Sequence, residues 1–129
     1  MSIPFNVIQR GEPGVAGGGT KKFYAQALTR QTMDIDAITH RIEQISTVSG
    51  ADIRAVLYAL IDVIPDMLSD GHVVKMGEVG RMRISLSSTG HDKSSDVTAA
   101  SVRKARIIFT PGKKLEDMLK LLTFQKESA

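Results

Sequence analysis

The stretch FTPGKKL, residues 109–115, marks the point where one kind of secondary structure gives way to another. Pro111 and Gly112 break a strand, because proline has no N–H to donate and glycine has no side chain to pack. The apolar residues before them share one parity, which predicts a strand with one buried face: Ala105, Ile107 and Phe109. A short helix is expected after them, over residues 113–122, with an inner apolar face made of Leu115, Met118, Leu119 and Leu122.

Two further strands are predicted upstream, separated by a turn at Gly77 and Gly80. The first carries apolar or aromatic residues at positions of one parity: His72, Val74 and Met76. The second does the same with Met82, Ile84 and Leu86. Together with the strand before FTPGKKL they predict a three-stranded antiparallel sheet whose apolar face must be covered.

Helical periodicity precedes the strands. Isoleucines recur at helical spacing from Ile35 to Ile45, with Asp34 as a plausible N-cap. A longer apolar stripe follows Ser49, which has the character of a second N-cap. Pro65 is expected to kink or end that helix, and Ser69-Asp70-Gly71 is expected to close it. Helices, then strands, then a last helix predict an α+β fold.

The first part of the chain reads as a β-hairpin. Residues 3–10 and 21–28 each alternate, and the glycine-rich stretch between them is a loop by composition. We therefore expect an N-terminal hairpin extension over residues 1–33, followed by the main domain over residues 34–129.

The composition excludes several classes of protein. The 129 residues contain no Cys, which fits a reducing compartment, and no apolar run long enough for a signal peptide or a membrane span. The three histidines show no metal-ligand spacing, and no serine lies in a nucleophile elbow. We expect a cytoplasmic protein that is not an enzyme and needs no cofactor, metal, membrane or small-molecule substrate.

Charge is distributed unevenly along the chain. The formal net charge is −5 over residues 34–70 and +5 over residues 71–129. Because side chains alternate between the faces of a sheet, five basic residues are predicted on the face opposite the apolar one: Lys75, Arg81, Arg83, Lys104 and Arg106. Such a face repels itself and favours an anionic partner. The alternative is a solvated face balanced by acidic helices of a neighbouring subunit.

The order of elements and the segments GHVVKM (71–76), VGRM (79–82) and FTPGKKL (109–115) resemble the bacterial HU and integration-host-factor DNA-binding proteins. The resemblance covers residues 34–122, and residues 1–33 resemble the extension of an HU-related subgroup. It implies an HU-like fold and a nucleoid-associated, histone-like homodimer. Two such chains would bind double-stranded DNA with little sequence preference, with a β-ribbon arm at about residues 87–101.

Candidate DNA-binding residues come from two sources. The resemblance implies DNA contact by basic residues of the β-strands, namely Arg81, Arg83, Lys104 and Arg106, and by Lys113 at the start of the last helix. At that helix start, free N–H groups could bind a phosphate. The charge pattern of the sequence adds Lys75, Arg103 and Lys114.

The expected arm departs from the family pattern. Family arms are basic and end in a proline that wedges between base pairs, whereas residues 87–101 contain no Pro and no Arg and have a net charge of −1. Two functions therefore stay open: a sequence-tolerant DNA-binding dimer, or an HU-fold dimer that serves protein contacts with weak or no DNA binding.

Overall fold

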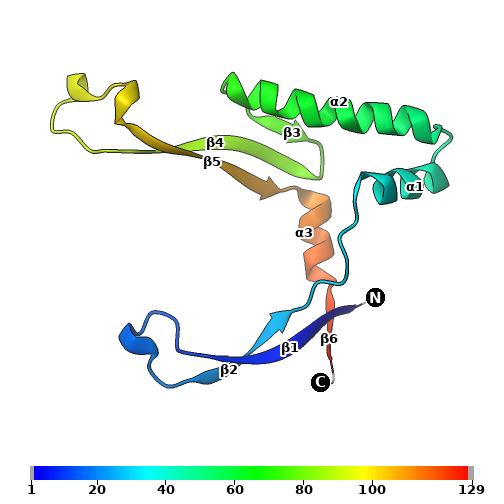
Figure 1. The fold of residues 1–129 in the computed structure, drawn as a ribbon, viewed down its shortest axis with the longest axis horizontal. Helices are drawn as coiled ribbons and strands as arrows, with labels where there is room; N and C mark the ends of the chain where they lie inside the picture. The colour runs from blue at the N-terminus through cyan, green and yellow to red at the C-terminus, as the bar shows by residue number, and fades with distance from the viewer. Residues whose placement is uncertain (1, 128–129) are drawn as a thin grey trace. The chain divides into compact units, whose positions relative to one another are not determined.

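Contacts divide the chain into two compact units, one of residues 33–117 and one of residues 1–32 with 118–129. The computed structural model describes residues 2–127. It contains three α-helices and two three-stranded sheets (Figure 1), so the predicted α+β class is confirmed.

Two capped helices open the larger unit. Helix α1 spans Ile35–Ile45, and the Asp34 carboxylate accepts a hydrogen bond from the Ala37 N–H at 3.0 Å. Helix α2 spans Gly50–Ser69, and the Ser49 hydroxyl accepts from the Asp52 N–H at 3.3 Å. Each cap satisfies a backbone donor that has no partner within its helix, so both predicted helix starts are confirmed.

Helix α2 does not end at Pro65. Four more helical residues follow before Asp70 caps the helix, and Gly71 then takes a positive φ of 85°. The missing N–H of a proline removes one helical hydrogen bond, which a 20-residue helix tolerates near its end. The helix therefore continues past Pro65 and closes at Ser69, Asp70 and Gly71, as the sequence predicted.

The sheet of this unit has the order β3-β4-β5, with all neighbours antiparallel. Strand β3 spans Val74–Met76, β4 spans Gly80–Ser88 and β5 spans Val102–Pro111. Met82 lies opposite Val74 on one side and Phe109 on the other, so the predicted apolar residues share one face. Helix α3 begins within the FTPGKKL segment and spans Lys113–Lys120 rather than the expected 113–122.

The smaller unit is a sheet rather than a simple hairpin. Strands β1 (Ser2–Arg10) and β2 (Lys22–Ala27) form the predicted antiparallel pair. Strand β6, Thr123–Lys126, adds to the other edge of β1 in parallel, which gives the order β2-β1-β6. The predicted hairpin is present, but it is part of a second sheet, and the expectation of a single sheet is wrong. The final strand pairs with residues more than a hundred positions away, and local periodicity carries no information about such a partner.

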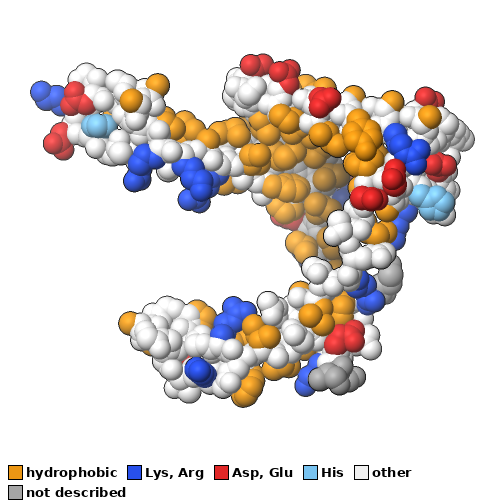
Figure 2. Space-filling model, viewed as in Figure 1, with side chains coloured by type: hydrophobic (Ala, Val, Ile, Leu, Met, Phe, Trp, Pro, Cys, Tyr) orange, Lys and Arg blue, Asp and Glu red, His pale blue; other side chains and the backbone are white. Residues whose placement is uncertain are grey.

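The hydrophobic core of the described chain is small. Only three hydrophobic side chains are buried, namely Ile53 and Leu68 from α2 and Val74 from β3. Figure 2 shows hydrophobic side chains gathered openly along α2 and the adjoining part of the sheet. Several α2 residues are far from buried, among them Val56 with 66% and Ile61 with 48% of its surface exposed. The larger unit therefore leaves much of its apolar surface uncovered.

Candidate nucleic-acid interface

The sheet register brings five basic side chains to one face. Directly opposite residues of an antiparallel pair lie on the same face. Lys75 lies opposite Arg81, and the remaining three lie opposite neutral residues: Arg83 opposite Ile108, Arg106 opposite Ser85, and Lys104 opposite Ser87. These five side chains, Lys75, Arg81, Arg83, Lys104 and Arg106, are called the basic face below. The structure places these residues on the face that the sequence pattern predicted. Their contact with DNA stays a prediction.

Nothing within the sheet neutralises the basic face. Strands β3, β4 and β5 contain no Asp or Glu. Among the residues that the structure describes, no member of the basic face forms an ion pair. Figure 2 shows Lys and Arg side chains projecting from one side of the β4–β5 ribbon. An arrangement of this kind raises the local concentration of anions and costs electrostatic free energy in their absence.

Arg103 lies at an irregularity that the alternation pattern did not predict. The pairing steps from Ser87 opposite Lys104 to Ser88 opposite Val102, so Arg103 is the extra residue of a β-bulge. Its guanidinium donates to the Ser88 carbonyl oxygen at 3.5 Å. A bulge redirects side chains, and strict alternation therefore does not place Arg103 on either face.

The start of α3 is less available than the sequence suggested. The backbone N–H groups of Gly112 and Lys114 donate to the carbonyl oxygens of Val79 and Glu78, at 2.8 and 3.2 Å. The Lys113 ammonium pairs with Asp117 at 2.8 Å. The expected free N–H groups of this helix start are thus partly used to dock it on the β3–β4 turn. Lys114 has no ion-pair partner among the described residues.

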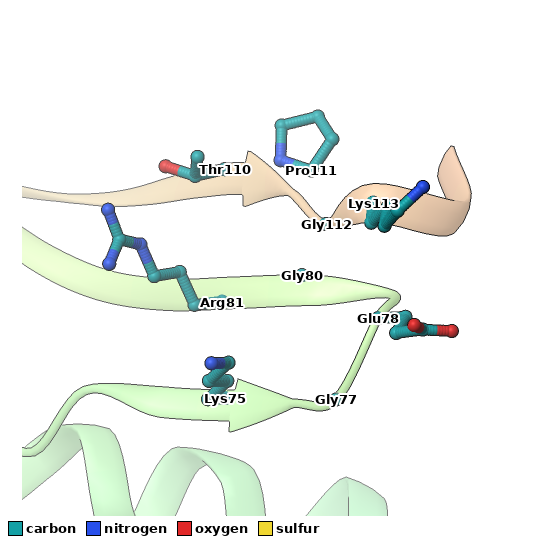
Figure 3. Close-up of a pocket in the computed structure, with 9 residues that line it drawn as sticks. All are labelled: Lys75, Gly77, Glu78, Gly80, Arg81, Thr110, Pro111, Gly112 and Lys113. Carbon is teal, nitrogen blue, oxygen red and sulfur yellow. The ribbon is translucent and has the colours of Figure 1, made fainter. Parts of the chain in front are cut away.

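A pocket lies where this turn, the end of β5 and the start of α3 meet (Figure 3). Glycines line much of it: Gly77, Gly80 and Gly112. A Cβ on Gly80 would lie 2.5 Å from the Thr110 carbonyl oxygen, and one on Gly112 would collide with the backbone of Glu78. These glycines allow β4, the turn and the PGKK segment to approach closely. Lys75, Arg81 and Thr110 supply polar side chains to the pocket.

The end of the β4–β5 ribbon is a folded loop. Residues 89–101 contain two short 3-10 turns, Ser94–Asp96 and Ala99–Ser101. Ser101 is buried, and its hydroxyl lies 3.1 Å from His91 Nε2 and accepts from the Thr98 N–H at 3.1 Å. The Thr89 N–H donates to the Ser101 carbonyl oxygen at 2.9 Å. Sequence reasoning missed this order, although Thr98 and Ser101 have the spacing of a capping box.

The described residues contain no group of three or more His, Asp or Glu side chains placed to hold a metal ion. Nor does the described chain contain a helix that is both long and apolar enough to cross a membrane.

Comparison with known proteins assigns the fold to a family. Residues 1–126 match the HU-HIG family, described as an HU domain fused to a wHTH, Ig or glycine-rich motif. The chain belongs to this family, and the predicted HU-like character is confirmed at that level.

One solved structure shares the fold over nearly the whole chain. It is a crystal structure from Bacteroides vulgatus ATCC 8482, provisionally assigned as a bacterial DNA-binding protein. The TM-score is 0.64 with 18% sequence identity, over 98% of this chain and 50% of that one. This chain therefore spans about half the length of that protein. No curated protein matches the sequence.

Proposed function

We propose that this protein binds double-stranded DNA with little sequence preference, as a homodimer, through the basic face of its β3-β4-β5 sheet. The observation that carries the proposal is the basic face itself. Its five Lys and Arg side chains have no ion-pair partner among the described residues and lie on strands that contain no acid. Phosphate contacts position a protein on DNA without reading the sequence, and Arg and Lys are the side chains that make them. Membership of the HU-HIG family and the provisional assignment of the structural relative support the same function.

The uncovered apolar surface supports the dimer. A groove in the larger unit is lined by Ile64, Pro65 and Leu68 from α2 and by Met82, Ile84, Ala105 and Ile107 from the sheet. Large contiguous apolar patches on soluble proteins mark interaction sites. A second copy would bury these side chains and provide the core that one chain lacks. The same association would place two basic faces on one molecule.

A paired substitution tests the role of the basic face. Arg83→Ala with Arg106→Ala removes two members that pair with no acid in the described structure. We expect weaker binding to duplexes of unrelated sequence alike, with the slope of log K against log salt flatter by about 0.9 for each phosphate that the variant no longer neutralises. Fluorescence anisotropy with two or three unrelated labelled duplexes measures both quantities. Wild-type affinity in the double variant would contradict the proposal.

The folded loop at the ribbon end favours a second candidate function. Its net charge of −1 and its internal hydrogen bonds suit a surface that contacts protein rather than phosphate. In that case the HU-like dimer would bind DNA weakly or not at all, and the wild-type chain would show no duplex binding at low salt. The same titration therefore separates the two functions.

A further inference from the structure

Three polar side chains form a row across the sheet at its α3 end. Lys75 on β3 lies directly opposite Arg81 on β4, and Arg81 lies directly opposite Thr110 on β5. Adjacent strands are spaced by about 4.8 Å, so the row spans roughly 10 Å. Figure 3 shows all three side chains at the pocket, each projecting from its own strand. The name phosphate row is used below for Lys75, Arg81 and Thr110.

The phosphate row lacks a counter-charge. Like charges placed directly opposite on neighbouring strands destabilise a sheet. Among the described residues, none of the three side chains has a hydrogen-bond or ion-pair partner. Glu78 also lines the pocket, but Figure 3 shows its side chain pointing away from Lys75 and Arg81 beyond the turn. An anion between Lys75 and Arg81 would turn a repulsion into two attractions.

The neighbouring helix start is a weaker competitor for that anion. Two of its N–H groups already donate to the β3–β4 turn, and Lys113 is already paired with Asp117. Gly77 also lines the pocket, and an added Cβ there would meet nothing within 4 Å, so this side of the pocket is open to an approaching anion. Among the described side chains that line the pocket, the donors without a partner are therefore those of the phosphate row.

From these observations we infer that the phosphate row binds one phosphate of the DNA backbone in each protomer. The planar guanidinium of Arg81 can donate to two phosphate oxygens, Lys75 adds a second positive charge, and the Thr110 hydroxyl donates a neutral hydrogen bond. The inference rests on the proposed function and names the residues that would bind one phosphate. Two members of the row are charged and the third is neutral, so substitutions of them should affect the salt dependence of binding differently.

Single substitutions exploit this division. Thr110→Val keeps the side-chain shape and removes only the hydroxyl, so we expect at least about tenfold weaker DNA binding with an unchanged salt slope. Arg81→Gln should weaken binding and also flatten the slope by about 0.9 per protomer. Lys93→Gln removes one exposed charge from the ribbon end and is the matched control for charge. Circular dichroism and solution mass confirm that each variant keeps the wild-type fold and assembly.

The outcomes distinguish failure of the proposed phosphate site from failure of the proposed function. If the wild-type protein binds no duplex, the proposed function fails, and the phosphate site fails with it. If the wild-type protein binds but Thr110→Val retains wild-type affinity, the phosphate site is wrong and the function stands. Equal slope changes in Arg81→Gln and Lys93→Gln would show that only net charge matters, which also overturns the phosphate site.

Discussion

Gly80 shows how a single residue holds the larger unit together. Its φ of 147° lies in a region that side-chain-bearing residues rarely adopt, and an added Cβ would meet Phe109 and the Thr110 carbonyl oxygen at 2.5 Å. The contact with Phe109 ties β4 to the FTPGKKL segment. Neither the strain nor the close approach can be relieved by moving a flexible side chain alone.

Gly80→Ala should therefore lower the free energy of unfolding by about 1–3 kcal/mol. Gly90→Ala is the matched control, because a Cβ at Gly90 meets nothing within 4 Å and its φ is not positive. Urea unfolding followed by circular dichroism, at equal protein concentration, compares the two variants. Equal stability of both would contradict the role assigned to Gly80.

At the scale of elements, local patterns predicted most of what was found. Capping residues at Asp34 and Ser49 and the alternation around Ile84 fixed helices and strands to within a few residues. The same alternation placed the basic face, because parity alone decides the face of a regular strand. Where the strand is irregular, at Arg103, the pattern could not decide.

Other elements depend on information that is not local. Strand β6 has four residues and is fixed by parallel pairing with β1 at the far end of the chain. The partial use of the α3 start follows from its docking on Glu78 and Val79, which no spacing rule contains. Tertiary contacts determine both features. Because docking uses part of the α3 start, the remaining candidate DNA-binding residues lie mainly on the sheet.

The folded loop at the ribbon end gives the prediction at this scale. Replacing residues 89–101 by Asn-Gly would join the paired Ser88 and Val102 through a two-residue hairpin turn. Since the loop has one Lys and a net negative charge, we expect the salt slope to change by no more than about 0.9 per protomer. Duplex titrations of this variant and of the wild type at several salt concentrations measure the change in slope. Loss of most of the affinity would show that the loop itself contacts DNA.

At the scale of the whole molecule, the proposed function requires a second copy of the chain. The described chain buries only Ile53, Leu68 and Val74 as hydrophobic core, while apolar residues of α2 and the sheet remain open. Burial of apolar surface is the main favourable term in folding and association, so the proposed dimer would supply the core that one chain lacks. Folding and dimerisation would then be one process.

Ile61→Asp tests this coupling. Ile61 shares a helix face with Ile64 and Leu68 of the apolar groove, so a carboxylate there would be buried by a partner. Sedimentation should give twice the chain mass of 14.0 kDa for wild type and for the control Asp62→Ala. The Ile61→Asp variant should be monomeric or unfolded. A wild-type monomer at tens of micromolar would contradict the dimer.

The most direct test of the central claim is the salt dependence of wild-type binding to a labelled duplex of arbitrary sequence. Two basic faces offer enough side chains to neutralise about six or more phosphates. Affinity should then fall by about a thousandfold or more between 50 and 200 mM salt, equally for unrelated sequences. Absence of binding at the lower salt concentration, or binding that is insensitive to salt, would contradict the account.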